Sequence, residues 1–489
     1  MTQLPHALNW IDGEWSDSPI KASSVDPATG GTIGSFADAT LGDAERAVAA
    51  ARRAFLHSPW RDDRRLRARV LNAIADRIEA RADELAQILA TENGKILPEA
   101  RFEVATVPSK LRYCAALALA QHGRALAVRP NAYSMVLHEP VGVAGLIVPW
   151  NSPVVLLMRS LGPALAAGTT VVAKMPGQTA QVNAFIARIL SEIPELPAGV
   201  VNIFSESGIA GSAFLVEAPD VPVISFTGST RTGRAIAAAG AARLKRFGLE
   251  LGGKTPMIVF DDADIEAALP VLEKAVTVFA GQFCMAGSRI LAERGIADRL
   301  RQALAERLAK VRLGPASDPA SEMGPLIDQQ SVARINAVVE KALAEGARAI
   351  VRGGPANDPA LAAGAFYRPT LLEVSSPELA IVQEEVFGPV ATFQVFEGEA
   401  AAIALANNSD FGLAASIWSR NPDRQLRLAR ALQVGTVWIN DWAAIHDEFE
   451  EGGFKQSGLG RLNGLASLHD FQEVKHIALK ATELLPVLS

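Results

Sequence analysis

The chain has 489 residues, of which 49% are hydrophobic and 20% are charged, and its formal net charge at pH 7 is -6. This length predicts two or three domains with well-developed cores. The weakly acidic balance has no basic run, so we expect no nucleic-acid partner. Its two cysteines cannot form a disulfide framework. The longest apolar run, residues 141–150, is about half of a membrane span. We see no signal peptide and expect a cytoplasmic protein without membrane contact.

The first third of the chain changes from short strands to helices and then to a strand pair. We expect strands around residues 11–15 and 26–30, and amphipathic helices from residue 41 to 92, where Leu66, Val70, Ile74 and Ile78 form one stripe. A further helix reaches about residue 121. Residues 124–148 are strand-like, and an isolated hairpin is marginally stable, so we predict an arm that pairs with another element, such as a second subunit. The end, residues 476–488, is similarly apolar without a helical period.

Strands and helices alternate through the rest of the chain. We predict strands at residues 145–148, 170–174, 200–204 and 223–226, each followed by a helix. A second alternating region, residues 258–440, contains predicted helices at 265–281, 297–311 and 330–345 and strands at 348–351 and 435–440. This order predicts an α/β fold with two doubly wound parallel sheets, which bind ligands beyond the carboxyl ends of their strands.

Cys284 is the better nucleophile candidate of the two cysteines. Cys114 lies in an alanine-rich apolar run and is expected to pack in a core, whereas Cys284 lies among small and polar residues. A thiol with a pKa near ~8.5 needs a base or an electropositive site nearby to react at neutral pH. Glu250, expected on a glycine-rich turn, is a candidate base. An incidental, structural Cys284 remains the alternative at this point.

Residues 248–255 fit the phosphate-loop pattern of nucleoside triphosphatases. That loop must follow a strand and open a helix, whereas here Arg243-Leu244-Lys245-Arg246 precedes it and a strand-like run follows. We therefore reject a nucleoside triphosphatase. Residues 458–464 miss the spacing of the dinucleotide fingerprint and are predicted to be a loop.

Eight segments together resemble the aldehyde dehydrogenase superfamily, in family order and over nearly the whole chain. They are Pro149-Trp150-Asn151, Lys174, Phe226-Thr227-Gly228-Ser229, Glu250-Leu251-Gly252-Gly253-Lys254, Cys284, Glu385-Val386-Phe387-Gly388-Pro389, residues 435–440, and Lys455-Gln456-Ser457-Gly458. The resemblance implies a Rossmann-like cofactor-binding domain (1–118 and 141–252) and a catalytic domain (253–452). It also implies an oligomerisation arm and tail (119–140 and 469–489) in a homodimer or homotetramer.

The resemblance implies an NAD(P)-dependent, non-acylating mechanism. Cys284 would attack the aldehyde carbonyl, and the Asn151 amide with the cysteine's own N–H would hold the oxyanion. Hydride transfer would leave a thioester, which water activated by Glu250 would hydrolyse. The structural alternatives are a helix N-cap for Asn151 and an exposed turn carboxylate for Glu250.

The resemblance also implies a binding site for NAD or NADP. Lys174 would bind the adenosine ribose, Ser229 the pyrophosphate, Glu385 the nicotinamide ribose and Phe387 the nicotinamide face. Taken alone, Lys174 could be a surface charge and Phe387 a core residue. The other expected cofactor contacts are Ile147, Pro149, Trp150, Gln178, Gly208, Phe226, Gly228, Leu251 and Gly252.

Several positions depart from the family pattern. Gly177 stands where relatives often carry a glutamate that repels a 2′-phosphate, so we expect NADP to be tolerated alongside NAD. Residues 206–208 keep only the last glycine of the adenine-side turn, Gly208. Leu462 stands where many relatives have a second glutamate, which leaves Glu250 as the only strong base candidate.

The substrate pocket also departs from the family pattern. Its expected residues are Ser152, Arg159, Phe283, Met285 and Glu451. Glu450 and Glu451 replace a common proline–aromatic pair, and Arg159 lies two helical turns beyond Asn151. A polar aldehyde is indicated, unless Arg159 instead pairs with a glutamate.

Three other functions are alternatives to aldehyde oxidation. They are a thiol hydrolase or acyl transferase with a Cys284–His446 pair, a coenzyme A-acylating semialdehyde dehydrogenase, and an inactive scaffold. The seven histidines show no ligand spacing, so no metal site is expected.

Overall fold

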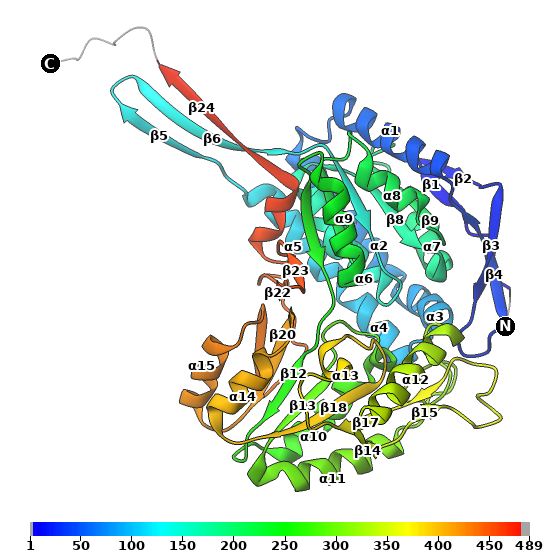
Figure 1. Cartoon of the computed structure of the whole chain (residues 1–489). Coiled ribbons are helices and arrows are strands. Elements are labelled where there is room, and N and C mark those ends of the chain that lie inside the picture. The colour runs from blue at the N-terminus through cyan, green and yellow to red at the C-terminus, as the bar shows by residue number, and fades with distance from the viewer. Residues whose placement is uncertain (1–2, 481–489) are drawn as a thin grey trace.

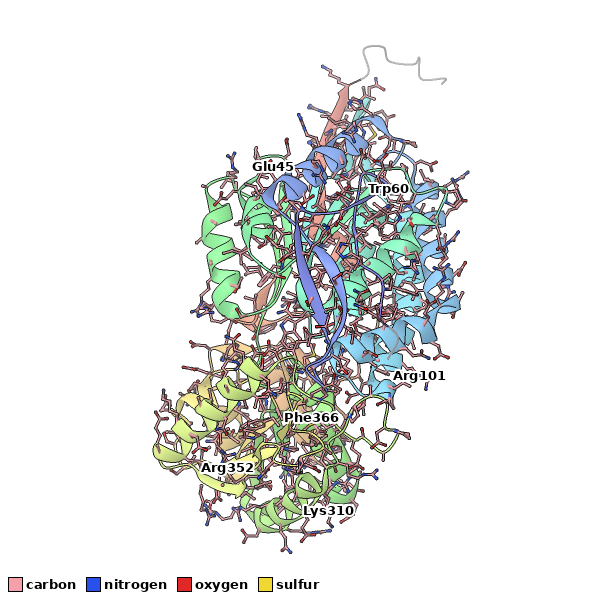
Figure 2. The ribbon with its side chains drawn as sticks, turned by 90° about the vertical axis from the view of Figure 1, so that its right-hand side faces the viewer. Glu45, Trp60, Arg101, Lys310, Arg352 and Phe366 are labelled. Atoms are coloured by element: carbon pink, nitrogen blue, oxygen red, sulfur yellow. The ribbon has the colours of Figure 1, made fainter. Side chains whose placement is uncertain are left out.

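The computed structural model describes residues 3–480, which form two α/β bodies and a projecting β arm (Figure 1). Each body is built around its own largely parallel sheet, so the predicted fold of two doubly wound sheets is confirmed. Figure 2 shows the two bodies stacked, with buried Trp60 in the first and buried Phe366 in the second.

The first body contains an eight-stranded sheet in the order β2-β1-β9-β8-β7-β10-β11-β23. The five strands from β9 to β11 run parallel. Antiparallel pairing adds β1 and then β2 at one edge of the sheet and β23 at the other. The strands are β1 (Asn9–Ile11), β2 (Glu14–Ser16), β7 (Val143–Ile147), β8 (Thr170–Pro176), β9 (Val201–Glu206), β10 (Val223–Thr227), β11 (Arg246–Glu250) and β23 (Gly458–Leu459). Helices on both faces bury the central strands, as near-continuous apolar runs require.

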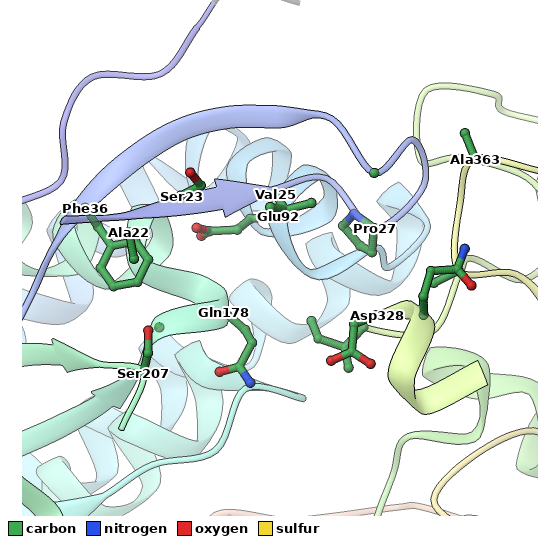
Figure 3. A pocket seen from close by; sticks show the side chains of 15 residues that line it. Ala22, Ser23, Val25, Pro27, Phe36, Glu92, Gln178, Ser207, Asp328 and Ala363 are labelled. Carbon is green, nitrogen blue, oxygen red and sulfur yellow. The ribbon is translucent and has the colours of Figure 1, made fainter. Parts of the chain in front are cut away.

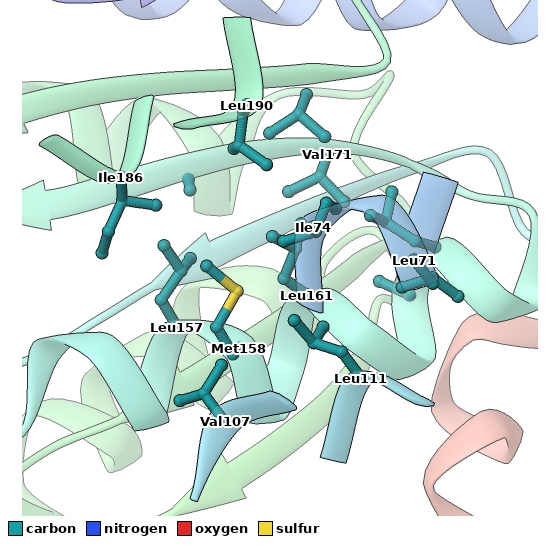
Figure 4. Close-up of a cluster of buried hydrophobic side chains, with 14 of the residues drawn as sticks. Leu71, Ile74, Val107, Leu111, Leu157, Met158, Leu161, Val171, Ile186 and Leu190 are labelled. Carbon is teal, nitrogen blue, oxygen red and sulfur yellow. The ribbon is translucent and has the colours of Figure 1, made fainter. Parts of the chain in front are cut away.

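Nine α-helices and a short 3₁₀ turn cover this sheet. They are α1 (Leu41–His57), α2 (Arg64–Ala80), α3 (Ala82–Asn93), α4 (Leu97–Ala105), α5 (Val107–Ala120), α6 (Pro153–Ala167), η1 (Gly177–Thr179), α7 (Ala180–Ser191), α8 (Ala210–Glu217) and α9 (Thr230–Ala241). The predicted apolar stripe of α2 is buried, with Ile74 packing near Leu111 and Leu161 (Figure 4). This core fixes α6, the helix that begins just after Asn151.

The second body contains a seven-stranded sheet in the order β14-β17-β18-β13-β12-β20-β21, parallel except at β14. Its strands are β12 (Pro256–Val259), β13 (Arg289–Glu293), β14 (Arg348–Val351), β17 (Thr370–Glu373), β18 (Val390–Phe396), β20 (Ala414–Trp418) and β21 (Thr436–Ile439). Its helical segments are α10 (Ile265–Thr277), η2 (Val278–Gly281), α11 (Arg294–Lys310), α12 (Gln329–Ala344), α13 (Ala380–Gln383), α14 (Gly398–Asn407) and α15 (Pro422–Ala431).

The arm is a three-stranded sheet in the order β24-β6-β5, and it projects from the first body (Figure 1). The predicted hairpin is β5 (Arg124–Arg129) with β6 (Ala132–Pro140), and its partner in this chain is β24 (Gln472–Lys480). Residues 481–488 of the predicted apolar end lie outside the described part. The remaining elements are β3 (Ile20–Val25) with β4 (Thr32–Asp38), β15 (Gly354–Pro355) with β16 (Tyr367–Arg368), β19 (Phe411–Gly412) with β22 (Phe454–Lys455), and η3 (Leu465–Phe471).

The phosphate-loop-like segment, residues 248–255, begins inside strand β11, which the sequence analysis did not predict. β11 ends at Glu250, so this residue lies at a strand end and not on a glycine-rich turn. The segment then enters β12 and opens no helix, which upholds the rejection of a nucleoside triphosphatase. No helix within residues 3–480 is long and apolar enough to span a membrane.

Candidate active site

Cys284 follows a turn of unusual backbone conformation at the end of α10. Phe279, Ala280 and Gly281 all have positive φ, at 52°, 53° and 72°. A Cβ on Gly281 would lie 2.2 Å from the carbonyl carbon of Gly388, so only glycine fits there. Left-handed residues with side chains are uncommon and persist where surrounding contacts hold them. The turn therefore fixes the direction in which the chain reaches Cys284.

Asn151 is tied to this segment by a buried hydrogen bond. Its Nδ2 donates to the carbonyl of Gln282 over 3.0 Å. The interpretation of Asn151 as the helix cap is wrong, because Ser152 is the N-cap and α6 begins at Pro153. Glu103 accepts hydrogen bonds there from the N–H groups of Val154 (2.9 Å) and Val155 (3.2 Å). Since an amide nitrogen has two N–H donors, the second N–H of Asn151 is available for another acceptor.

The thiol of Cys284 lies in a setting that favours its neutral form. Burial raises its pKa to about 12, and the carboxylates of Glu451, Glu385 and Glu250 act in the same direction, against the charge of Arg159. The electropositive surroundings that a reactive thiol needs are therefore not supplied by this chain on balance. A base must take the proton.

Glu250 has the properties of a general base that activates water. Only 5% of the residue is exposed, and Oε1 has no hydrogen-bond partner among the described residues. Burial raises the pKa of this carboxyl to about 8, with Glu451 and Asp470 adding to the rise and Arg159 and Arg461 opposing it. A carboxyl that titrates near neutral pH can exchange protons at working pH.

A closed circuit of contacts, meaning a chain of contacts that starts and ends at the Cys284 loop, joins the catalytic candidates to the residues expected to bind the nicotinamide. A Cβ on Gly253 would lie 2.4 Å from the Cys284 carbonyl oxygen, and the Gly253 N–H donates to Glu385 over 3.2 Å. The ring of Phe387, a residue with φ of 53°, meets that of Trp150 edge-on at 5.7 Å between centroids. Trp150 precedes Asn151, so the circuit returns to the Cys284 loop.

A Cβ on Gly252 would lie 2.6 Å from the Glu385 carboxylate, and burial raises the pKa of Glu385 to about 7. Leu251 donates its N–H to the Ser457 carbonyl over 2.9 Å. Gly252 therefore leaves room for the carboxylate beside the backbone of this segment.

The expected adenosine and pyrophosphate contacts lie at the carboxyl ends of neighbouring strands. Ile147 of β7 is paired with Lys174 on one side and with Phe226 on the other. Burial lowers the pKa of Lys174, while Glu206 and Asp38 oppose the shift. Lys174 is therefore not the fully solvated surface charge that was the alternative.

Ser229 caps α9 by accepting from the Thr232 N–H over 3.3 Å, and the first turn of this helix is exposed. Gly228 precedes it, and its N–H donates to the Glu250 carbonyl over 3.0 Å. Pro149 lies half-buried between β7 and Trp150. The exposed N–H groups of a helix start are suited to bind an anion.

A cavity of about 370 Å³ lies beside Gly177, Gln178 and Ser207 (Figure 3). Gly177 departs from the family pattern of a glutamate at this position. A Cβ on Gly177 would lie 2.5 Å from the Ser207 hydroxyl, so the Ser207 side chain occupies the space that a larger residue 177 would need. Gly208 is exposed, and Glu206 accepts from the N–H of Gly211 over 2.6 Å at the start of α8. Residue 177 contributes no carboxylate to this cavity, whereas Glu92 and Asp328 line other parts of its wall.

A second cavity, of about 940 Å³, reaches Cys284. It is lined by five of the expected substrate and catalytic residues besides Cys284: Asn151, Ser152, Arg159, Phe283 and Glu451. The prediction that Met285 lines the substrate pocket is wrong. Its side chain is 1% exposed, packs with Leu413 and Trp438, and does not line the cavity.

Buried ion pairs surround this second cavity, and the sequence analysis did not identify most of them. Arg159 bonds Glu451 over 2.9 Å, which is the alternative considered for Arg159. Lys95 pairs with Glu103 and lies 3.9 Å from the centroid of the Phe279 ring. Lys95 and Glu103 are far from Cys284 in sequence and match no local pattern, so only the fold brings them together.

His446 also lines the cavity, but among the described residues no hydrogen bond joins it to Cys284. Its ring packs against Phe449 at 6.3 Å between centroids. This geometry does not support the cysteine–histidine alternative. Within residues 3–480, no three histidine, cysteine or acidic side chains are grouped so as to hold a metal ion.

Known proteins resemble this chain over nearly its full length. The model of the aldehyde dehydrogenase family matches residues 15–477. Betaine aldehyde dehydrogenase of Bacillus subtilis is 38% identical, with 96% of each chain covered. Aldehyde dehydrogenase 1A1 of Gallus gallus is 38% identical, covering 98% of this chain and 94% of its own. A crystal structure of a betaine aldehyde dehydrogenase point mutant from Staphylococcus aureus, in complex with NAD+ and with a BME-modified cysteine, has a TM-score of 0.95 at 36% identity. It covers 99% of this chain and 98% of its own.

Proposed function

Because this chain belongs to the aldehyde dehydrogenase family and oxidises an aldehyde with NAD(P), we propose that Cys284, Asn151 and Glu250 carry out the reaction. The observation that carries the proposal is the buried circuit that links Asn151 to the Cys284 loop and that loop to Glu385. The residues present fit a dinucleotide, since Lys174 and the exposed helix start at Ser229 lie near the carboxyl ends of parallel strands, and the Glu385 carboxylate accepts from Gly253. When bound, NAD or NADP supplies the acceptor for the hydride.

Each residue has one task in this proposal. The Cys284 sulfur bonds the aldehyde carbon as its proton passes to a base, and the free N–H of Asn151 donates to the carbonyl oxygen as it becomes an oxyanion. Departure of the hydride from that carbon leaves a thioester. Glu250 then takes a proton from water, whose oxygen attacks the thioester, and the acid leaves as the thiol is reformed.

The same proposal assigns the cofactor contacts. Lys174 binds the adenosine ribose, Ser229 the pyrophosphate, Glu385 the nicotinamide ribose, and Phe387 with Trp150 the nicotinamide face. The neighbouring strand-end and turn residues complete the site: Ile147, Pro149, Gln178, Gly208, Phe226, Gly228, Leu251 and Gly252. We assign residues 1–118 and 141–252 to cofactor binding and 253–452 to catalysis. β23 joins the sheet of the first body, and η3 packs against α6 and β11 of the same body.

The arm supports a proposal of self-assembly as a dimer or a dimer of dimers. β5 and β24 are its outer strands, and exposed Leu126, Val128 and Val474 lie on them. A long unpaired edge with apolar side chains is a surface that natural proteins normally cover. A cytoplasmic location fits a nucleophile that must stay reduced, since both cysteines are free thiols.

One assay tests the proposed function against its nearest alternative. Aldehyde-dependent reduction of NAD is followed by absorbance, with and without coenzyme A. We expect full turnover without coenzyme A and a carboxylic acid as the product, because Glu250 is present to activate water. Turnover only with coenzyme A, giving an acyl thioester, would favour the acylating enzyme. Thiol-dependent ester hydrolysis without any aldehyde oxidation would favour the hydrolase.

A further inference from the structure

The cavity beside Cys284 offers no free positive charge to a substrate. Three lysine and arginine side chains line it, and each has a carboxylate partner: Lys110 with Asp447 (2.6 Å), Arg159 with Glu451 (2.9 Å), and Lys274 with Glu99. His446 also lines it and forms no ion pair among the described residues. Of the acidic side chains in the lining, Asp441 forms no ion pair among the described residues. The walls are therefore neutral to slightly negative.

The Arg159–Glu451 pair is the one most firmly held. The side chains are only 7% and 6% exposed. The second oxygen of Glu451 accepts from the Asn463 amide over 3.2 Å, and the Asn463 carbonyl in turn accepts from Lys110 over 2.8 Å. Arg159 Nε has no partner among the described residues, so the guanidinium keeps one unused donor. This network holds Glu451 against Arg159 from two sides.

The pair lies within electrostatic reach of the proposed reaction centre. Arg159 projects from α6, the helix that begins two residues after Asn151. Its charge opposes the burial-driven rise in pKa of both Cys284 and Glu250, while Glu451 adds to that rise. A substrate bound to the sulfur therefore extends into a region where the two charges already cancel.

We propose that the Arg159–Glu451 pair determines substrate specificity, an inference that rests on the proposed function. The pair excludes aldehydes that carry a carboxylate and admits neutral or cationic aldehydes to the cavity. A carboxylate that enters must give up its water and needs a cation in return. The nearest guanidinium is already bonded to Glu451, whose like charge repels the newcomer. A neutral chain meets no such cost, since the lining also includes Phe102, Phe279, Phe283 and Trp442.

The first test compares two aldehydes of similar length on the unmodified enzyme. We expect kcat/KM for pentanal to exceed that for 4-oxobutanoate by about a hundredfold or more. Equal efficiencies, or a preference for 4-oxobutanoate, would overturn the inference while leaving the proposed function standing. Failure to oxidise any aldehyde would contradict the proposed function instead, and the inference would then be decided by the binding measurement below.

The second test removes the charge that neutralises Arg159. We expect Glu451→Gln to raise kcat/KM for 4-oxobutanoate relative to pentanal by about tenfold, mainly through KM, because the freed guanidinium gains an anionic partner. Glu450→Gln is the matched control, since this neighbour is exposed and does not line the cavity, and its ratio should not change. The double variant Arg159→Gln/Glu451→Gln should lose the gain.

Binding gives a readout that does not depend on turnover. Succinate, which carries two carboxylates, should raise the Tm of Glu451→Gln but not that of the unmodified enzyme or the double variant. A folded Glu451→Gln enzyme without this response and without a change in aldehyde ratio would overturn the inference. If Glu451→Gln does not fold, succinate stabilisation or efficient 4-oxobutanoate oxidation by the unmodified enzyme would overturn it equally.

Discussion

The two sides of the proposed active site are built differently. The cofactor side uses strand ends, exposed turns and a helix start, where Ser229, Gln178 and Gly208 have few side-chain contacts. The reaction side uses buried side chains that are joined by ion pairs and by close backbone contacts around Cys284. The first arrangement depends on local chain geometry, the second on contacts between distant segments. Substitutions should therefore lower catalytic turnover most on the reaction side and least on the cofactor side.

Replacing the nucleophile should have the largest effect. We expect Cys284→Ser to lower kcat by at least about a thousandfold, because a hydroxyl is a far weaker nucleophile than a thiolate. Reduction of NAD with pentanal measures it. Cys114→Ser is the control, as Cys114 packs in the core of the first body and should leave turnover intact. Comparable losses in both variants would contradict the assignment.

Replacing the base comes next. We expect Glu250→Gln to lower steady-state kcat by about a thousandfold while leaving a burst of reduced cofactor, because the thioester forms but is not hydrolysed. Leu462 offers no second carboxylate. Rapid-mixing absorbance separates the burst from the steady state, and a normal steady-state rate would refute the role of Glu250.

The pH dependence should be smaller, at about tenfold per pH unit. Burial raises the pKa of Glu250 to about 8, and a base acts only in its deprotonated form. At saturating aldehyde, kcat should therefore rise with pH between 6 and 8 and level off above pH 8. A profile that is flat from pH 6 would show that Glu250 is already ionised or does not limit turnover.

The difference in kcat/KM between NAD and NADP should be the smallest effect, because it depends on the exposed turns of the cofactor side. Without a carboxylate at Gly177, we expect NADP to be used with a kcat/KM less than about a thousandfold, or roughly 4 kcal/mol, below that of NAD. Ser207→Asp would place a carboxylate on the same cavity wall and should weaken NADP use more than NAD use. Rejection of NADP by about a thousandfold in the unmodified enzyme would contradict the expectation.

The sequence predicted more of the cofactor side than of the reaction side. Apolar periodicity predicted α2 and α10, and the alternation of strands and helices predicted both sheets, because each signal lies within a short stretch of chain. The resemblance supplied the cofactor residues, which stay a prediction. The sequence analysis did not decide whether Arg159 pairs with a glutamate, because its partner Glu451 lies 292 residues away in the sequence. Glu103 at the start of α6 was missed, since its partners lie some fifty residues away. Met285 was misplaced because neighbours of Cys284 need not face the same cavity.

The antiparallel pairing of β23 with β11 bears on how the enzyme is made. Asn151, Glu250 and Cys284 all emerge from the ribosome well before residues 457–459, which border the Glu250 strand. Until those residues arrive, the nascent first sheet ends in an open edge at β11, a surface that invites pairing with other chains. Synthesis of residues 457–459 both closes that edge and completes the surroundings of the base, so catalytic competence is acquired only after the second body has been translated.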